Sequence, residues 1–351
     1  MPAETAPQER LWMAFPTGGY TLGDTEEDAH AARSVWAAVA NAAVEFEPVT
    51  VVVDPDDVGI AARYLNRNVE VLAAPLNDAW MRDIGPTFVL DQDGSLGAVD
   101  WIFNGWGAQD WARWDKDALI AGEVSGRSGA THIVSALVNE GGGIQVDGQG
   151  TVLVTETVQL DPGRNPGLSR ADVEAELART IGATQVVWLP RGLARDSERF
   201  GTRGHVDIVA AIPSPGTLLV HSQQDPRHPD FQVSRDIIEH LRTTRDAAGR
   251  EWTIIEVPAL KCSGMAKALS TTATSTTSWS TAASSPVPSG TPTMTRRCRS
   301  WRRPTPAGVW SALTPVSSSP AAAESTASPN SSLLPRRKRW TMTQTTRTST
   351  P

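Results

Sequence analysis

The strongest constraint on the fold is a change of sequence pattern near residue 260. Before that point, short apolar stretches with strand or helix periodicity alternate with turns rich in Gly, Pro and Asp. After Lys261, Ser, Thr, Pro and Arg dominate, and neither periodicity persists. We therefore predict a folded domain over residues 1–260 and a disordered, basic tail over residues 261–351.

Charge divides the chain at the same place. Residues 1–260 contain 38 Asp and Glu against 20 Lys and Arg, whereas residues 261–351 contain 12 Lys and Arg and a single acid, Glu324. An acidic domain raises the local concentration of cationic ligands, although acidic surfaces also serve solubility alone. The charge fits a cationic substrate without requiring one, and no nucleic-acid partner is predicted.

Neither a membrane protein nor an exported protein is predicted. No apolar run approaches the roughly 18 residues that a membrane-spanning helix needs, and Met1–Arg10 carries acids and prolines instead of a basic and then apolar leader. The two cysteines, Cys262 and Cys298, form no CxxC pair and lie near no histidine cluster. We expect a soluble, cytoplasmic protein without a structural metal.

The order of predicted elements indicates an α/β protein. We expect a helix over 28–46, a strand over 48–53, a short helix over 58–65 and a strand over 69–72. A hairpin follows, with strands at 87–90 and 96–101. Hairpin, helix and strand then recur in that order, as 143–146, 151–156, a helix from Ser169 and 185–189, and again as 205–212, 217–221, 232–245 and 252–257. This recurrence predicts an architecture of repeated units.

Three segments combine charged side chains with glycine: Trp80-Met-Arg-Asp83, Glu140-Gly-Gly-Gly143 and Gly204-His-Val-Asp207. Each lies at the edge of a predicted strand, where loops bring separate segments together. His205 and Asp207 stand two apart in a predicted strand and would point to the same side. One such residue alone is more often a cap, a surface ion pair or a buried structural histidine, but the combination indicates acid–base chemistry on a bound ligand.

A tryptophan cluster leaves two readings open. Trp106, Trp111 and Trp114 stand close together in the sequence. Indole faces beside acids bind cations well, but the same residues would be equally at home in an apolar core.

Together these segments resemble the family of agmatine deiminases and bacterial peptidyl-arginine deiminases. No single motif is generic, and all occur together between about Trp12 and Leu260. The matching motifs are Trp12-Met-Ala-Phe-Pro16, Asn77-Asp-Ala-Trp-Met-Arg-Asp-Ile-Gly-Pro-Thr87, Glu140-Gly-Gly-Gly-Ile-Gln-Val-Asp-Gly-Gln-Gly-Thr151, Arg164-Asn-Pro166, Trp188-Leu-Pro-Arg-Gly-Leu193 and Gly204-His-Val-Asp207. The resemblance implies a pentein fold, an α/β-propeller of five ββαβ blades around a central substrate site, incomplete in this chain.

The resemblance also implies roles for individual residues. Asp83 and Asp207 would bind the guanidinium nitrogens, Glu140 and Trp80 would line the same pocket, and His205 would be the general acid and base. Carboxylates suit a planar guanidinium because they match its forked N–H donors in bidentate fashion. In the family, a cysteine thiolate attacks the guanidinium carbon, ammonia departs with a proton from the histidine, and water hydrolyses the thiouronium intermediate. No metal or cofactor is implied.

The function implied by the resemblance is conversion of agmatine and water to N-carbamoylputrescine and ammonia, a step of putrescine formation. Deimination of peptidyl-arginine or of another guanidine is an alternative. A guanidine-binding protein without catalysis, or a pseudogene product, is an alternative of another class. The family also leaves a homo-oligomer open.

The chain departs from the family at the nucleophile. The family carries it near the C-terminus, in a glycine run followed by Ile-His-Cys-Ile-Thr-Gln-Gln, and no such segment is present. Cys262 and Cys298 stand in other contexts, so neither is assigned a catalytic role.

A shift of reading frame after about Leu260 explains this departure. Codons available for Pro320–Ser331, read from a shifted base, can encode Gly-Gly-Gly-Gly-Ile-His-Cys-Ile-Thr-Gln-Gln, with the cysteine codon straddling Thr326 and Ala327. The competing explanation is a Ser/Thr-rich regulatory tail. We expect the frame-shifted chain to expose unpaired strand edges and to lack catalysis by the family mechanism.

Overall fold

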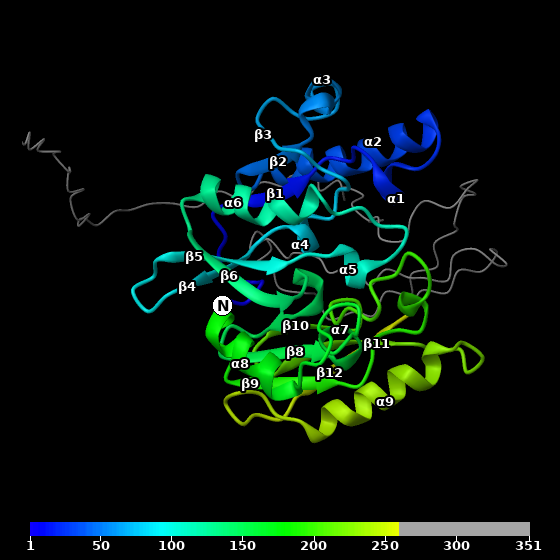
Figure 1. The fold of residues 1–351 in the computed structure, drawn as a ribbon. Coiled ribbons are helices and arrows are strands. Elements are labelled where there is room, and N and C mark those ends of the chain that lie inside the picture. The colour runs from blue at the N-terminus through cyan, green and yellow to red at the C-terminus, as the bar shows by residue number, and fades with distance from the viewer. Residues whose placement is uncertain (260–351) are drawn as a thin grey trace, which may run out of the picture. The chain divides into compact units, whose positions relative to one another are not determined.

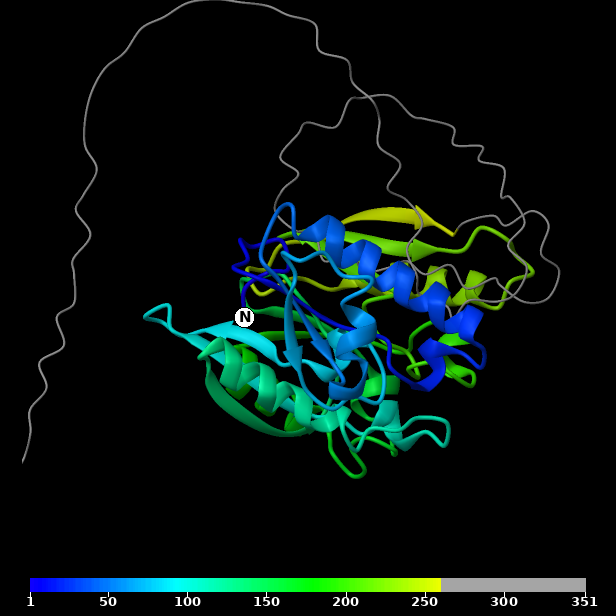
Figure 2. The same ribbon diagram turned by 90° about the horizontal axis from the view of Figure 1, so that it is seen from above.

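The computed structural model describes residues 1–259. The predictions for the remaining residues, including the disordered tail and the shifted reading frame, lie outside the described residues. Within residues 1–259, the strands form four three-stranded sheets that follow one another in chain order (Figures 1 and 2).

The first sheet differs from the others because all its strands are parallel. Its central strand is β2 (Val49–Val53), flanked by β1 (Leu11–Ala14) and β3 (Glu70–Ala73). The connection from β1 to β2 contains α2 (Glu26–Ala43), which begins at Thr25 with a side-chain cap on the backbone N–H of Asp28. The shorter helices of this region are α1 (Gly19–Leu22), η1 (Pro55–Asp57) and α3 (Val58–Ala61). The predicted elements are confirmed to within a few residues, whereas β1 was not predicted.

The other three sheets share one order: an antiparallel hairpin, a helix, and a third strand parallel to the second. The second sheet comprises β4 (Thr87–Leu90), β5 (Leu96–Ile102), α6 (Ile120–Ser128) and β6 (Thr131–Val138). The third comprises β7 (Gln145–Val146), β8 (Thr151–Thr155), α8 (Arg170–Ile181) and β9 (Gln185–Leu189). The fourth comprises β10 (Ala210–Ser214), β11 (Thr217–Ser222), α9 (Asp230–Thr243) and β12 (Thr253–Pro258). The predicted repetition is confirmed, and α6 and β6 complete a unit predicted only as a hairpin.

Short helices lie in the loops at the ends of the strands. They are α4 (Met81–Ile84), α5 (Gly105–Ala108), η2 (Asp117–Leu119), η3 (Gly141–Gly143), α7 (Glu156–Gln159) and η4 (Arg195–Ser197). Three of these loops follow the last strand of a sheet: α4 comes after β3, η3 after β6 and η4 after β9. All three segments singled out in the sequence therefore leave the same end of successive sheets.

The apolar core is divided into layers between neighbouring sheets. One cluster joins Val99 of β5 and Val152 of β8 to Leu177 of α8. The next joins Leu153 of β8 and Leu218 of β11, with α9 packed on the same cluster. Each helix thus fills the space between its own sheet and a neighbour, which fixes the relative position of the loops at the strand ends.

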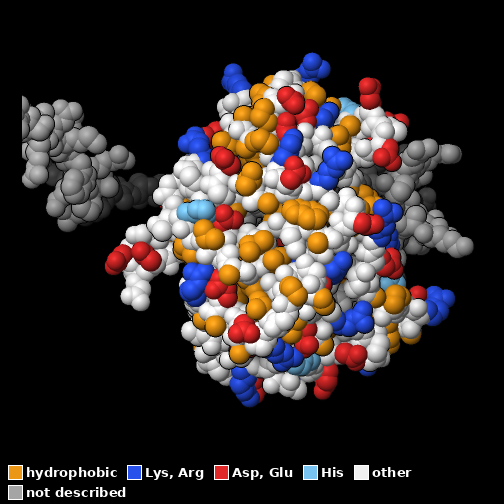
Figure 3. Space-filling model, viewed as in Figure 1, with side chains coloured by type: hydrophobic (Ala, Val, Ile, Leu, Met, Phe, Trp, Pro, Cys, Tyr) orange, Lys and Arg blue, Asp and Glu red, His pale blue; other side chains and the backbone are white. Residues whose placement is uncertain are grey.

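The surface of the described residues is mixed. On the face in Figure 3, acidic and basic side chains lie among apolar ones, so the acidic excess is not gathered into one patch on this face. None of the helices within residues 1–259 has the length and hydropathy needed to cross a membrane.

The N-terminus of α8 provides a test of local stability. Ser169 and Asp172 form a reciprocal capping box, so Ser169→Ala should lower the free energy of unfolding by about 1 kcal/mol. Urea denaturation monitored by circular dichroism measures the change. The control is Ser169→Asn, which keeps a capping side chain and should retain most of the stability. An unchanged unfolding midpoint in Ser169→Ala would contradict the assignment.

Candidate functional site

The three predicted segments converge on one buried imidazole. His205 Nε2 lies 3.2 Å from Glu140 Oε2, and Nδ1 lies 3.9 Å from Asp83 Oδ1 and 3.9 Å from Asp207 Oδ1. The four residues are between 0% and 8% exposed. Their charges therefore interact in a largely water-free environment, where electrostatic effects are strong. The structure brings together four of the five predicted site residues around a single ring.

The predicted strand over 205–212 is wrong in its first half. His205 and Asp207 lie in a loop, and β10 begins only at Ala210, after a turn in which Val209 and Ala210 donate to the carbonyl of Val206. Other hydrogen bonds hold this segment: the Asp196 carboxylate accepts from the backbone N–H groups of residues 202, 204 and 205, and the N–H of Asp207 donates to the carbonyl of Gly142. Those donors are unavailable to a strand ladder. The two side chains converge because of this turn and not because of strand alternation.

Gly142 allows the close approach of the other segments. A Cβ atom on Gly142 would lie 2.3 Å from His205 Nδ1 and 2.9 Å from Asp207 Oδ2. The Gly142 backbone also donates to Asp83 Oδ1 at 3.1 Å and accepts from the Asp207 N–H at 3.2 Å. Glycine is required here for space, and its peptide groups fix the positions of both carboxylates.

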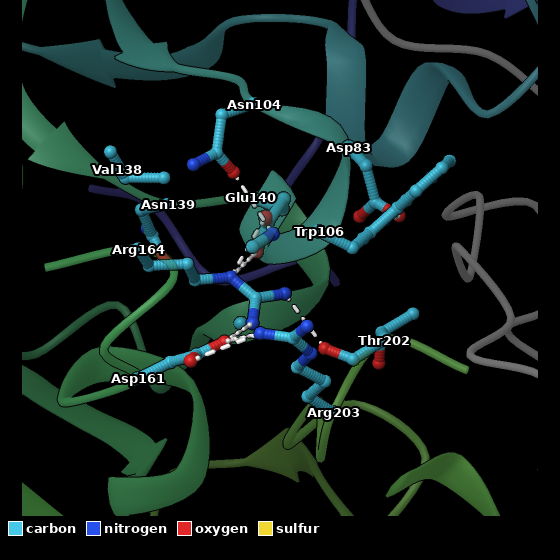
Figure 4. A network of polar contacts seen from close by, with 12 residues as sticks. Asp83, Asn104, Trp106, Val138, Asn139, Glu140, Asp161, Arg164, Thr202 and Arg203 are labelled. Carbon is cyan, nitrogen blue, oxygen red and sulfur yellow. Dashed lines mark hydrogen bonds and ion pairs between the residues drawn. The ribbon is translucent and has the colours of Figure 1, made fainter. Parts of the chain in front are cut away.

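Glu140 lies behind the histidine. Its carboxylate is fully buried and accepts from Arg164 Nε with both oxygens, at 3.0 and 3.1 Å. Figure 4 shows the Arg164 side chain between Glu140 and Asp161. The resemblance implied that Glu140 lines the ligand pocket, whereas its carboxylate contacts His205 and Arg164. This position suits a group that orients His205.

Two tryptophans occupy different positions at the site. Trp80 precedes α4, packs edge-on against Trp36 with ring centroids 5.7 Å apart, and lines the cavity described below. Trp106 is buried and its indole N–H donates to Asp83 Oδ2 at 2.9 Å. Trp106 also stacks on Trp111, at 5.3 Å. Trp106 packs in the core, as one of the two readings expected, and it also lies on the wall of the cavity described below, where its N–H orients Asp83; cation binding by the cluster stays a prediction.

A cavity of about 1080 Å³ lies beside Asp83 and Asp207. Trp80, Trp106 and Trp111 are among the aromatic residues on its wall. Tyr20 and Phe200, which stack at 4.3 Å, line it as well. A small organic ligand fits this volume, whose wall combines apolar side chains with charged ones, among them Asp83, Asp207 and Arg82.

The environment sets the protonation of the site. Burial by itself lowers the pKa of His205, but the three surrounding carboxylates outweigh it and raise the pKa to about 9. Burial raises the pKa of Asp207 to about 6; the imidazolium of His205 opposes the rise and Asp83 adds to it. Burial also favours the neutral form of Glu140, but Arg164 and His205 prevail and lower its pKa. Near neutral pH the site holds a charged imidazole among carboxylates.

This arrangement suits a planar cation that loses or gains protons. Asp83 and Asp207 can accept from the forked N–H groups of a guanidinium, and the imidazolium can donate a proton to a leaving group. Within residues 1–259 there is no group of three or more His, Cys, Asp and Glu that could hold a metal ion. The two cysteines of the chain lie outside the described residues.

Two sets of contacts at the site were not predicted: the hydrogen bond from Trp106 to Asp83 and the ion pairs of Arg164. Trp106 is flanked by glycines with positive φ, Gly105 at 69° and Gly107 at 89°, and a Gly-Trp-Gly sequence is a signal for such a fixed turn. Arg164 was noted only as part of a family motif. Its ion pairs join segments far apart in the chain, so no local pattern indicates them.

Comparison with known proteins gives a consistent result. The family described as Porphyromonas-type peptidyl-arginine deiminase matches residues 1–282. A Streptomyces coelicolor protein named "Putative agmatine deiminase" is 57% identical over 259 residues, 74% of this chain and 76% of that protein. A Pseudomonas putida protein named agmatine deiminase is 38% identical over 265 residues, 74% of this chain and 70% of that protein.

Solved structures agree. The agmatine deiminase of Enterococcus faecalis is similar with a TM-score of 0.69 and 34% identity, over 74% of this chain and 70% of that chain. A solved structure described as a peptidyl-arginine deiminase candidate is similar with a TM-score of 0.67 and 25% identity, over 74% of this chain and 76% of that chain. The predicted pentein type of α/β fold is thereby confirmed.

Substitution of Gly142 tests the packing of the site. In Gly142→Ala, the added Cβ must displace His205 and Asp207, so affinity for a guanidinium ligand such as agmatine should fall roughly tenfold or more, the effect of losing one charge-assisted hydrogen bond. Isothermal titration calorimetry measures the affinity. The control is Gly59→Ala, where an added Cβ meets no atom within 4 Å. Equal affinities of the two variants would argue against this packing.

Guanidinium binding is also expected to depend on pH. The pKa of Asp207 is raised to about 6, so its carboxyl is neutral below that pH and one of the two anions is lost. Affinity should therefore weaken as pH falls through about 6, as measured by calorimetry on both sides of this value. Asp207→Asn should bind weakly and without this dependence. A wild-type affinity that stays constant over the range would refute the expectation.

Proposed function

The chain belongs to the family of Porphyromonas-type peptidyl-arginine deiminases, and on this premise we propose that its site is built for agmatine, which the intact family enzyme converts with water to N-carbamoylputrescine and ammonia. The 351-residue chain, which lacks the family's cysteine segment, is expected to be inactive. One observation carries the proposal: two buried carboxylates flank one buried imidazole, each 3.9 Å from Nδ1. This group lies entirely within the part of the chain that matches the family and its relatives.

The chemistry of agmatine fits the geometry. The guanidinium of agmatine is planar and, with one nitrogen substituted, carries five N–H donors. It stays charged at all relevant pH values. Asp83 and Asp207 lie on the cavity wall and can hold its nitrogens, and Trp80 can cover the methylene chain. The excess of acidic residues in the domain favours approach of a dication.

His205 is proposed as the group that moves protons. Its imidazolium can donate to the nitrogen that leaves as ammonia, and the neutral ring can then accept a proton from the attacking water. The carbon–nitrogen bond breaks only after a nucleophile has added to the guanidinium carbon, and in the family this nucleophile is a cysteine thiolate. No cysteine occurs within residues 1–259. The described residues thus supply the proposed binding and proton-transfer groups, and the thiolate of the family mechanism is the group that is missing. The shifted reading frame would supply it at the codon that straddles Thr326 and Ala327.

A second candidate follows from the same observation: binding of a guanidine without turnover. Production of the ureido product separates the two, measured colorimetrically for the 351-residue chain and for a version whose sequence after about Leu260 is read in the shifted frame. Product from the shifted version alone, with agmatine binding by both, would support the deiminase function and the frame shift. Product from neither would favour binding only. Arginine peptides in the same assay test the alternative substrate.

Three further points belong to this proposal. A boundary between a deiminase domain and a separate tail near residue 260 agrees with the change in composition. A cytoplasmic location agrees with the lack of a disulfide framework, since the chain has two cysteines. A homo-oligomer would be detected by light scattering of the full chain.

Replacement of one carboxylate tests the proposed ligand directly. Asp83→Asn keeps the shape of the side chain and the donor from Trp106 but removes the charge, so agmatine affinity should fall tenfold or more. Asp225→Asn is the matched control, because Asp225 pairs with Arg227 at the surface. If both variants bind agmatine as tightly as the wild type, Asp83 does not hold the guanidinium.

A further inference from the structure

Arg164 is a buried cation with contacts on three sides. Its side chain is 0% exposed. Nε donates to both oxygens of Glu140, Nη1 donates to Asp161 Oδ2 at 2.9 Å, and Nη2 donates to the carbonyl of Thr202 at 2.7 Å. Figure 4 shows these partners around one guanidinium. Only arginine offers donors in this fork, because a lysine ammonium is a single point charge.

Two of these contacts lead to His205. Glu140, held along one edge by Arg164, presents its Oε2 to His205 Nε2 at 3.2 Å. Thr202, bonded to Arg164 through its carbonyl, stands three residues before His205, and its hydroxyl accepts from the backbone N–H of His205 at 3.2 Å. The guanidinium thus supports both the side-chain partner and the backbone of the imidazole.

The support of Arg164 itself is built into neighbouring loops. Asp161 Oδ2 accepts from Arg164 Nη1 and, at 3.0 Å, from Arg203 Nη1 as well. Gly107 approaches so closely that a Cβ would lie 2.5 Å from Asp161 Oδ2. Asn104 of the same loop donates to the carbonyl of Gly163 at 2.9 Å. A buried ion network with this many contacts defines one geometry.

We propose that Arg164 is a positioning residue which acts through Glu140 to orient the imidazole of His205 and to keep it charged. The proposal rests on the proposed function, in which His205 donates a proton. A buried carboxylate without a cation along its edge takes up a proton. Without Arg164, His205 is the one cation left beside Glu140 among the described residues, so the pKa of Glu140 rises and its carboxylate stabilises the imidazolium less.

Other charges face the same ring and are part of the balance. Asp83 from α4 and Asp207 from the loop before β10 lie 3.9 Å from Nδ1. Arg82 and Asp196 act on Asp207 through their charges. None of these four contacts Arg164 by a hydrogen bond within residues 1–259. Their effect on the pKa of His205 should remain when Arg164 is replaced. A change of that pKa in an Arg164 variant therefore reports the contribution that passes through Glu140.

The test is the titration of the His205 ring, followed by nitrogen-15 NMR on the full chain and assigned with His205→Gln. The wild-type midpoint is expected at about pH 9. In Arg164→Met the His205 midpoint should fall by about one pH unit or more. The reason is that the negative charge of Glu140, which stabilises the imidazolium, is weakened. Arg242→Met is the control: it removes a surface cation that pairs with Glu239, outside the network around Arg164, so the midpoint should stay unchanged.

Double substitution separates action through Glu140 from general disturbance. Glu140→Gln should lower the midpoint as Arg164→Met does, and the two together should give no further fall. If Arg164→Met alone does not fold, the double variant can still be compared with Glu140→Gln, because removing Arg164 and the charge of Glu140 together leaves no unpaired buried carboxylate. Additive shifts of the two variants, or an unchanged midpoint in Arg164→Met, would overturn the proposal. A rise of the midpoint would overturn it too, because it would mean that Arg164 acts directly on the ring. Agmatine affinity, measured separately, reports on the proposed function and does not enter this comparison.

Discussion

The charged imidazole of His205, enclosed by carboxylates away from water, is the interaction on which the rest of the site depends. Removing so many charges from water costs several kcal/mol per ion unless each finds partners in good geometry. The structure meets this requirement with Arg164 behind Glu140 and with the indole of Trp106 beside Asp83. The Gly142 peptide lies between Asp83 and Asp207. The loops and short helices at the strand ends place these partners in contact with the charged groups.

The repeated architecture makes this convergence geometrically simple. Each of the first three sheets ends in a parallel strand, and the loop that follows carries one part of the site: Asp83 after β3, Glu140 after β6 and His205 after β9. The helices packed between neighbouring sheets hold these strand ends in fixed relation. Side chains that are 57 and 65 residues apart along the chain therefore meet at one ring.

Much of the fold could be predicted from local pattern. The Asp-Gly hairpin of β4 and β5, the capped helix α8, and the strand β9 follow from turn chemistry, capping residues and apolar runs. Prediction failed where distant groups compete for the backbone. Residues 205–209 have the alternation of a strand, but their N–H groups have other acceptors: that of His205 donates to Asp196, that of Asp207 to the carbonyl of Gly142, and that of Val209 to the carbonyl of Val206. The strand β1 was missed because its four residues, Leu11–Ala14, include no β-branched residue and form too short a run to show a strand pattern.

By itself, the sequence determined the α/β class, the family, and the charged residues that meet at the site; the boundary near residue 260 stays a prediction. Periodicity, composition and motifs indicate these properties, and all three are local along the chain. Only the tertiary structure decided what each group contacts. It placed Glu140 behind His205 and joined Arg164 to Glu140, Asp161 and Thr202. The physical reason is that burial and ion pairing depend on distances in space between segments, and those distances exist only once the sheets have packed together.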